Sequence, residues 1–424
     1  MLYASTRQTF TMQLRPHQQR ALDAMLTADK GQILVPTGGG KTLIAIKDAV
    51  RRYASAESPQ TIVVVAPRIM LATQLSSEYL EHIDNANVLH VHSGETTHFK
   101  TTKSDRINLF VRMCHHVGEH VIIFTTYHSL PRIIDAGIDI NCCYFDEAHN
   151  GVQRNHFVGV AAASMTADAS YFFTATPKHT RRTNRGMNNG EIYGRVLCNV
   201  PAPELIKGGS ILPPTVVPYE VDFERQKGAD AAVNDRDMLL GVVDSLDAAS
   251  ASKVLVASPA SKVMGAMLFK TDIMHQLKER GYDVLHITSK YGAYVNQTKV
   301  NREQFFDTFD AWGKDPNRKF IIFHYSILSE GINVHGLTHT VMLRQLDIIE
   351  MAQTIGRVIR MNRDDAADIA TGKLTAGNVS MYRKSTGYVT VPVFKNYGAP
   401  TIKRLQKIVN TVFVDGMPAT SVVA

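Results

Sequence analysis

The stretch QILVPTGGGKT, residues 32–42, indicates how this chain is expected to fold. A short apolar run at residues 32–35 leads into a glycine-rich turn, and an amphipathic segment at residues 42–53 follows. Strand, glycine-rich turn and helix are the context of a phosphate-binding loop, in which backbone N–H groups close around phosphate oxygens. Val35 stands where such loops commonly have a first glycine, so the general pattern is met only in part.

The loop provides a separate group for each part of a nucleotide's phosphate chain. Its glycines let the backbone approach phosphate oxygens without a side-chain clash, and Lys41 adds a positive charge for the β- and γ-phosphates. The hydroxyl of Thr42 is expected to bind Mg²⁺, so we expect ATP and Mg²⁺ as cofactors. The residues predicted to bind ATP here are Pro36, Thr37, Gly38, Gly39, Gly40, Lys41 and Thr42.

Short apolar runs alternate with helical patterns along the chain. Buried strands are expected first at residues 32–35, 61–66, 121–125, 142–145 and 171–174, with amphipathic helices at 42–53 and 71–83. Further strands are expected at residues 253–257, 283–288, 319–323, 340–343 and 387–394, with a final helix at 400–412. Strands that alternate with helices predict an α/β fold of mostly parallel sheets covered by helices. Pro392 predicts an edge position for the last strand.

Proline and glycine interrupt this alternation near the middle of the chain. Residues 201–218 hold five prolines and an adjacent pair of glycines, a composition typical of a connector between domains. A chain of 424 residues is also too long for one ordinary core. We therefore predict an N-terminal domain at residues 1–206, a connector at 207–218 and a C-terminal domain at 219–424.

The composition is that of a soluble globular protein with a slight preference for polyanions. Of 424 residues, 44% are hydrophobic and 20% are charged, and the net charge is +7. The sequence shows neither a membrane-spanning run nor a secretory signal at residues 1–11, so we expect a cytoplasmic protein with no membrane partner. The cysteines form no Cys-x-x-Cys pair and are interpreted as reduced, buried side chains: Cys114, Cys142, Cys143 and Cys198.

A second motif, NCCYFDEAH at residues 141–149, is an apolar strand that ends in two carboxylates. Ligands of open α/β sheets bind at the carboxyl ends of strands, so both carboxylates are expected beside the phosphate-binding loop. Asp146 is then placed to hold Mg²⁺ and Glu147 to polarise the attacking water. His149 is interpreted as a link to the second domain, with a merely local hydrogen bond as the alternative.

Together these residues resemble superfamily 2 helicases of the DEAD/DEAH-box type, and the resemblance runs in order from residue 14 to about residue 360. It implies two RecA-like domains with the ATP site in the cleft between them. In LRPHQQ, residues 14–19, Gln18 takes the place of an adenine-recognising glutamine. In FTATP, residues 173–177, Thr174 and Thr176 are the implied link between hydrolysis and domain closure.

Two further segments of the first domain are similar to nucleic-acid-binding motifs of the same family. VVVAPRIMLATQ, residues 63–74, implies Arg68 as a contact to the phosphate backbone. FTTYHSL, residues 124–130, implies that the hydroxyl of Thr126 donates to another phosphate. Contacts of this kind ignore base sequence and weaken with salt.

The predicted second domain completes the set of family motifs. QTIGRVIR, residues 353–360, matches motif VI, and on a helix its key residues share one face: Gln353, Gly356, Arg357 and Arg360. The resemblance implies that Gln353 is catalytic, that Arg360 is an arginine finger at the γ-phosphate, and that Arg357 is its partner. YSILSEGIN, residues 325–333, resembles motif V and implies Ser326 for nucleic acid, with Gly331 and Asn333 for ATP.

The implied activity is a nucleic-acid-stimulated ATPase, a helicase or translocase that advances by closing and opening its two domains. Motif VI lacks the spelling frequent in RNA-directed relatives, and residues 186–214 resemble the connector of restriction-enzyme motor subunits and of phage or viral DNA helicases. Both features favour DNA over RNA and a role in replication, repair or recombination. Little length is left for an accessory domain, which favours a separate specificity partner protein. Two alternatives stay open: an RNA helicase or transcript-release factor, and an ATP-switched clamp without processive movement.

Overall fold

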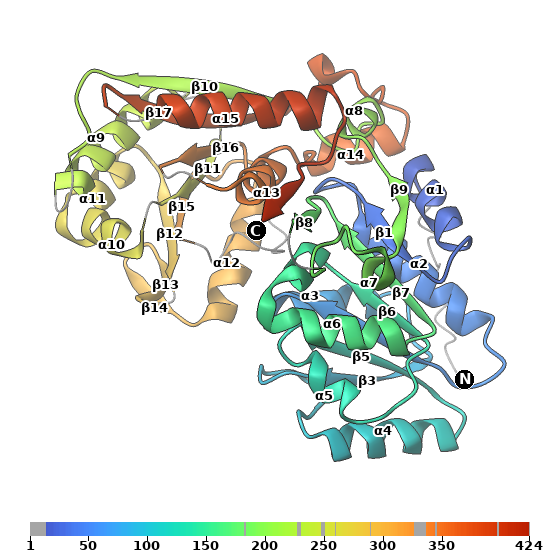
Figure 1. Ribbon diagram of the computed structural model, residues 1–424. Helices are drawn as coiled ribbons and strands as arrows, with labels where there is room; N and C mark the ends of the chain where they lie inside the picture. The colour runs from blue at the N-terminus through green and yellow to red at the C-terminus, as the bar shows by residue number, and fades with distance from the viewer. Residues whose placement is uncertain are drawn as a thin grey trace, which may run out of the picture.

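The computed structural model describes residues 14–181, 184–226, 230–246, 251–258, 260–288, 290–325, 336–343, 346–396 and 398–423. Two sheets of eight strands organise these residues into two lobes, which Figure 1 shows side by side. Helices cover both sheets, so each lobe is an α/β unit. The fold class predicted from the alternating pattern is confirmed.

The first sheet is parallel throughout, in the order β4-β3-β5-β2-β6-β7-β1-β9. Its central strands are continuous apolar runs because both faces are covered, and every residue of β2 is buried. Along β6, Tyr144 therefore joins one group of buried side chains and Phe145 the other. The strands are Lys30–Leu34 (β1), Thr61–Ala66 (β2), Ala86–Val91 (β3), Phe99–Lys100 (β4), His120–Thr126 (β5), Cys142–Phe145 (β6), Ala169–Thr174 (β7) and Arg195–Asn199 (β9).

Two helices of the first lobe begin shortly after strands of this sheet end. α2 (Lys41–Ala54) starts at the phosphate-binding loop and buries Ala45, Ala49 and Tyr53 at helical spacing. α3 (Ile69–Leu80) starts after β2 in the same way. The other helices of this lobe are Pro16–Met25 (α1), Ser104–His116 (α4), Leu130–Ile134 (α5), Ala148–Val152 (η1), Arg154–Thr166 (α6), Gly190–Tyr193 (α7) and Ala202–Lys207 (α8).

The second sheet has the order β10-β17-β16-β11-β15-β12-β13-β14 and is parallel except for two antiparallel pairings at one edge, β12 with β13 and β13 with β14. Its strands are Pro214–Val221 (β10), Lys253–Ala257 (β11), Asp283–Thr288 (β12), Gly292–Val295 (β13), Thr298–Val300 (β14), Phe320–His324 (β15), His339–Met342 (β16) and Gly387–Phe394 (β17). Its helices are Asp230–Asp244 (α9), Ser261–Lys270 (α10), Ile273–Glu279 (α11), Arg302–Lys314 (α12), Ile348–Val358 (α13), Arg363–Ala370 (α14), Val379–Met381 (η2) and Ala399–Val409 (α15).

The position predicted for the last strand from Pro392 is wrong, because β17 lies inside the sheet between β10 and β16. The pairing of β17 with β16 extends only to Val341 opposite Thr390, so Pro392 stands beyond the end of that ladder. The missing N–H of proline therefore leaves no bond unmade on this side. An interior strand can hold a proline where its neighbour on one side is shorter.

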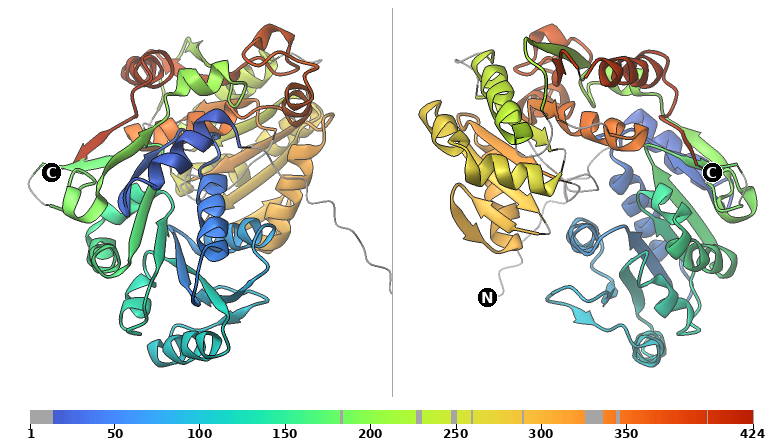
Figure 2. Two further views of the ribbon diagram at one scale, coloured as in Figure 1. Left: turned by 90° about the vertical axis from the view of Figure 1, so that its right-hand side faces the viewer. Right: turned by 60° about the vertical axis from the view of Figure 1, so that its left-hand side comes forward.

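At both of its ends, the second lobe is not separated from the first by a single boundary in the chain. β10 pairs with β17 from Pro214 onward, so the second sheet begins inside the predicted connector and before residue 219. At the other end, the π-helix Asn410–Val414 (η3) follows α15, and Ser421–Val423 (β18) pairs in parallel with Lys178–Thr180 (β8) of the first lobe. Figure 2 shows the C-terminal segment leaving the second lobe and reaching the first.

All four cysteines are buried and unpaired, as the sequence predicts. No helix in the described part of the chain is both long and apolar enough to cross a membrane.

Candidate active site

A cavity of about 390 Å³ lies where the phosphate-binding loop, the end of β6 and α13 meet. Its lining includes Thr37, Gly38, Gly40, Lys41, Thr42, Asp146 and Glu147 from the first lobe, and Gln353, Arg357 and Arg360 from the second. The residues predicted to be catalytic therefore line one cavity, although they are spread over more than three hundred positions of sequence. Pro36 belongs to the same loop but borders a smaller pocket beside it.

The loop bends in a way that two of its glycines make possible. Gly38 and Gly40 have φ angles of 89° and 81°, which residues with a Cβ rarely adopt. A Cβ on Gly40 would also lie 2.2 Å from Nε2 of Gln18. The turn sets Lys41 at the start of α2, where its Nζ lies 3.4 Å from the carbonyl oxygen of Val35 and 3.8 Å from Oε1 of Glu147.

Asp146 is fixed at the carboxyl end of β6 through its backbone. Its N–H donates to Val65 O at 2.9 Å, and its carbonyl accepts the hydroxyl of Tyr127 at 2.9 Å. Burial and the neighbouring Glu147 raise the pKa of Asp146 to about 7, while Lys41 opposes this shift. A buried carboxyl of this kind is suited to a dication, which favours its charged form. Because Thr42 lines the same cavity, Asp146 and Thr42 fit the predicted Mg²⁺ site.

Glu147 occupies a strained turn directly after Asp146. Its φ of 45° lies in the left-handed region, a conformation that costs a non-glycine residue about 1–3 kcal/mol. The turn directs the Glu147 carboxylate into the site, with Oε1 3.8 Å from Lys41 Nζ and Oε2 3.6 Å from His149 Nδ1. Glu147 thus lies between the side chains of Lys41 and His149 and lines the cavity.

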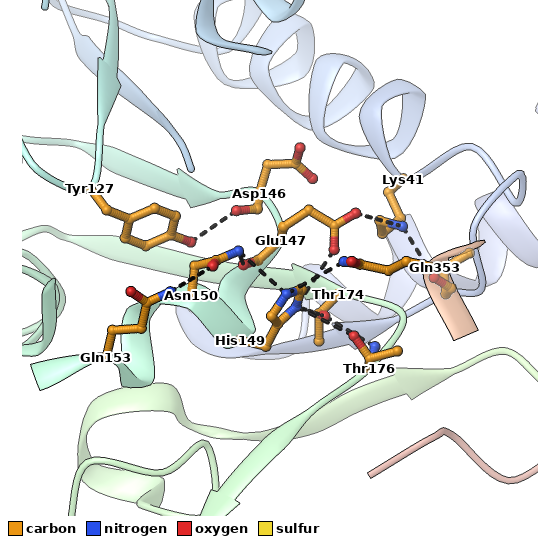
Figure 3. A network of polar contacts seen from close by, with 11 residues as sticks. Lys41, Tyr127, Asp146, Glu147, His149, Asn150, Gln153, Thr174, Thr176 and Gln353 are labelled. Carbon is orange, nitrogen blue, oxygen red and sulfur yellow. Dashed lines mark hydrogen bonds and ion pairs between the residues drawn. The ribbon is translucent and has the colours of Figure 1, made fainter. Parts of the chain in front are cut away.

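His149 stands at the centre of a polar network that joins the two lobes (Figure 3). Its Nε2 lies 3.3 Å from the amide nitrogen of Asn150 and 3.5 Å from that of Gln353 in the second lobe. Amide nitrogens only donate, so Nε2 accepts, and the Nδ1–H donates to Thr174 Oγ1 at 2.9 Å. Thr176 Oγ1 also lies 3.4 Å from this Nδ1. His149 therefore contacts the segments predicted to couple hydrolysis with domain closure, in addition to making a local hydrogen bond.

The second lobe reaches the site through α13. Gln353 and Arg357 are buried on this helix. Gly356 allows the close approach of the lobes, because a Cβ at this position would lie 2.6 Å from Cβ of Thr37 in the phosphate-binding loop. The glycine of motif VI thus lets the helix contact the loop directly.

The prediction that Arg360 shares the helical face of Gln353, Gly356 and Arg357 is wrong. α13 ends at Val358, Ile359 forms a turn, and Arg360 then pairs with the connector between the lobes. Leu212 N donates to Ile359 O at 2.7 Å, and Arg360 forms an antiparallel bridge with Ile211. The chain cannot remain helical here because it pairs with the connector, yet the side chain of Arg360 still lines the cavity.

Burial determines the electrostatics of Arg360. Desolvation lowers the pKa of its guanidinium to about 10, and the carboxylates of Glu78 and Glu147 oppose this shift. The group therefore stays charged at neutral pH in a poorly solvated place. Such a cation interacts strongly with phosphate charge, because little water screens it.

The predicted adenine-binding segment lies against the phosphate-binding loop. His17 Nε2 is 2.8 Å from Gly39 O, and Gln18 Nε2 is 3.5 Å from the same oxygen. Gln18 Oε1 accepts the backbone N–H of Arg15 at 2.9 Å. His17, which stands where the family usually has tyrosine, thus contacts the backbone of the loop. Gln18 lies beside the same part of the loop.

The residues implied for nucleic acid lie at the ends of two adjacent parallel strands. Ala66 of β2 pairs with Thr126 of β5, and Arg68 follows β2 as an exposed residue at the start of α3. Thr126 is buried, and its hydroxyl lies 3.3 Å from that of Ser129. Ser326, Gly331 and Asn333 lie outside the described residues.

One acidic residue of the cavity is missing from the sequence prediction. Glu78 of α3 lines the cavity and accepts a hydrogen bond from Gln74 Nε2 at 2.7 Å. Burial raises the pKa of Glu78, whereas the hydrogen bond from Gln74 and the charge of Arg360 lower it. Leu71, Gln74 and Glu78 are spaced at three and four residues, so one helical face after Arg68 points into the site. The helical spacing after Arg68 is therefore the feature of the sequence that could have predicted Glu78 in the cavity.

Two family models match the chain. Residues 11–179 match the family described as type III restriction enzyme, res subunit, and residues 237–362 match the helicase conserved C-terminal domain. No curated protein matches the chain. The matched regions correspond to the two lobes and contain the phosphate-binding loop and motif VI, respectively.

Solved structures share the two-lobed fold. The ATP-dependent Type ISP restriction-modification enzyme LlaBIII bound to DNA is 15% identical, with a TM-score of 0.69, over 97% of this chain and 31% of that one. A nuclease-deletion mutant of the Type ISP enzyme LlaGI with a DNA substrate mimic is 16% identical, with a TM-score of 0.60, over 96% and 30%. S. cerevisiae Dbp5 bound to RNA is 17% identical, with a TM-score of 0.55, over 96% and 89%. The chain spans about a third of the length of the restriction-modification enzymes.

The fold and the site thus define a two-domain, RecA-like helicase core. The two matched domains, together with this fold, support a superfamily 2 helicase of the type I and type III restriction motor kind, in agreement with the predicted resemblance. Helicase domains of this kind indicate an ATP-binding enzyme that hydrolyses ATP.

Proposed function

We propose that this protein is a nucleic-acid-stimulated ATPase that moves along or remodels DNA. The observation that supports it best is the division of one cavity between two lobes, with Lys41 and Glu147 on one side and Arg357 and Arg360 on the other. ATP in this cavity touches both lobes and favours their closure, and hydrolysis removes that bridge. A cycle of closing and opening is what a translocating enzyme needs.

The residues of the cavity support a division of labour in phosphoryl transfer. Lys41 and the backbone of the loop bind the β- and γ-phosphates, and Glu147 orients and polarises the attacking water. Arg360 stabilises charge on the γ-phosphate as it leaves, with Arg357 beside it. A bound Mg²⁺, held by Thr42 and Asp146, supplies neutralisation of phosphate charge.

The network around His149 supports a coupling role in the same cycle. His149 contacts Glu147 at 3.6 Å, Thr174 at 2.9 Å and Gln353 at 3.5 Å, so it joins the hydrolytic acid, motif III and the second lobe. A change in the distance between the lobes therefore alters the surroundings of Glu147. In this way polymer binding is transmitted to hydrolysis.

DNA is the favoured polymer, because residues 186–214 resemble the connector of restriction motors and residues 11–179 match the res subunit of type III restriction enzymes. The fold does not separate DNA from RNA, since the similar structures include a DNA-bound restriction enzyme and RNA-bound Dbp5. Arg68, at the exposed start of α3, is the proposed backbone contact of the first lobe. Thr126 contributes only if its hydroxyl exchanges Ser129 for a phosphate.

The test is steady-state ATP hydrolysis by the pure chain, alone and with single-stranded, duplex or branched DNA or with RNA, at two salt concentrations. We expect stimulation by DNA that weakens with salt, and no hydrolysis by Lys41→Ala. Stimulation by RNA alone would indicate an RNA helicase instead. Hydrolysis that responds to no polymer would contradict the motor proposal. A triplex-displacement assay then separates movement along DNA from clamping in place.

A further inference from the structure

Arg360 lies beyond the end of its helix, so something other than helical hydrogen bonds must hold it in position. α13 ends at Val358 with Ile359 as its C-cap, and the final carbonyls of a helix lack partners within the helix. On one side, the connector holds this segment through Leu212 N to Ile359 O at 2.7 Å and through the bridge between Ile211 and Arg360. The other side is held by a side chain from the segment before β17.

That side chain is Lys384. Its ammonium donates to Val358 O at 2.6 Å, to Arg360 O at 2.9 Å and to Leu337 O, just before β16, at 2.7 Å. Three donors thus meet three carbonyls, and two of these carbonyls belong to the end of motif VI. A cation at a helix C-terminus satisfies orphan carbonyls and interacts favourably with the helix dipole.

The backbone of Lys384 is itself anchored. Asp365 of α14 is fully buried, and its carboxylate accepts the backbone N–H groups of Arg383 and Lys384 at 3.2 Å each. The same carboxylate accepts Arg383 Nη1 at 2.8 Å. α14 begins directly after the segment of Arg360, so Asp365 ties Lys384 to the region that its side chain caps.

The position is costly for an ammonium group. Burial, together with the charges of Arg360 and Lys253, lowers the pKa of Lys384 to about 7, while Asp365 opposes this shift. A partly buried cation beside an arginine does not stabilise the fold in the way a surface lysine does. Its hydrogen bonds to the carbonyls of Val358 and Arg360 point to a role in fixing this segment rather than in stabilising the fold.

We infer that Lys384 is a positioning residue for Arg360: with the connector, it clamps the end of motif VI so that the arginine reaches the ATP cavity. The inference rests on the proposed role of Arg360 in hydrolysis. Lys384 touches backbone carbonyls, so it acts only through the placement of Arg360.

The test compares Lys384→Met, Arg360→Ala and the double variant in steady-state ATP hydrolysis. Misplacement of a catalytic group by about 1 Å costs about 10²-fold in rate, so we expect kcat of Lys384→Met to fall by about that factor while KM for ATP changes little. The double variant is expected to be no slower than Arg360→Ala, because two residues that act as a unit are not additive. Multiplied losses in the double variant, or an unchanged kcat in Lys384→Met, would overturn the inference.

Two further variants separate positioning from stability. Lys373→Met removes a lysine whose side chain is 74% exposed and lies 3.9 Å from Asp368, and it should leave kcat unchanged. Lys384→Gln keeps an amide donor for the carbonyls and should recover part of the lost rate. If Lys384→Met folds poorly, the test rests on Lys384→Gln. If Lys384→Gln has the melting temperature of the wild type but hydrolyses ATP no faster than an unfolded control, partial rescue is contradicted and so is the clamp.

A readout without ATP distinguishes failure of this inference from failure of the proposed function. Amide hydrogen exchange of Leu212, which donates to Ile359 O, should quicken in Lys384→Met and stay unchanged in Lys373→Met. If the variants show this pattern but the wild type hydrolyses no ATP, the proposed function fails and the clamp remains. If exchange of Leu212 is the same in all variants, the clamp fails whatever the ATPase activity.

Discussion

The two lobes carry the same kind of sheet but place their site residues by different means. In the first lobe, Lys41 begins α2 after the loop that follows β1, and Asp146 and Glu147 directly follow β6, so local sequence fixes them. In the second lobe, Arg360 lies past the end of α13 and is held by the connector and by Lys384. A motif predicts both the position and the local backbone of strand-end residues, whereas for Arg360 it predicts the position in the cavity but not the backbone that holds it there.

The largest effect is expected when the side chain of Arg360, which is held by distant segments of the chain, is removed. Arg360→Ala should lower kcat by about 10³–10⁵-fold, the range measured for arginine fingers in related hydrolases, with little change in ATP binding. Steady-state hydrolysis with equilibrium binding of a fluorescent ATP analogue measures both quantities. Unchanged turnover would remove Arg360 from the finger role and leave Arg357 as the candidate.

The matching change in the first lobe is Glu147→Gln, which keeps the shape of the side chain and removes its charge. A general base contributes about 10²–10⁴-fold, so kcat should fall by that factor while ATP still binds. Glu57→Gln, at an exposed loop position away from the cavity, serves as the control and should behave as the wild type. Persistent hydrolysis by Glu147→Gln would refute the assignment of the water-polarising acid.

The same difference between the two lobes explains which features of the fold and the site the sequence could predict. The strands β2, β6, β11, β12 and β17 match the predicted runs because continuous apolar stretches mark strands covered on both faces. The cavity residues of the first lobe follow from the same runs. The interior position of β17, the return of β18 to the first lobe and the extended backbone of Arg360 depend on partners far away in sequence. Glu78 was missed because no motif includes it, although helical spacing places it in the cavity.

The contact between the lobes is tested by Gln353→Ala, which removes the amide 3.5 Å from His149 Nε2. Coupling between sites typically amounts to about 5- to 150-fold, so stimulation of hydrolysis by DNA should fall within that range. Basal hydrolysis should fall less than stimulated hydrolysis. A proportional loss of both rates would show that Gln353 acts in the chemical step and does not couple the lobes.

The smallest expected effect concerns pH and Mg²⁺. The pKa of Asp146 is raised to about 7, so below that pH the carboxyl is increasingly protonated and must release its proton to bind a metal. The Mg²⁺ concentration for half-maximal hydrolysis should therefore rise by up to about tenfold per unit as pH falls below 7 and level off above it. A half-maximal concentration independent of pH between 6 and 8 would contradict metal binding by Asp146.

The central claim is that ATP completes its site by joining the two lobes, and the most direct test is the distance between them. Thr97 and Glu303 are exposed on opposite sides of the groove between the lobes, and the four native cysteines are buried, so Thr97→Cys and Glu303→Cys can carry a fluorophore pair. We predict that a non-hydrolysable ATP analogue with Mg²⁺ raises energy transfer, and that Lys41→Ala abolishes the change. Transfer that is unaffected by the analogue, or that changes equally in Lys41→Ala, would contradict a site shared between the lobes.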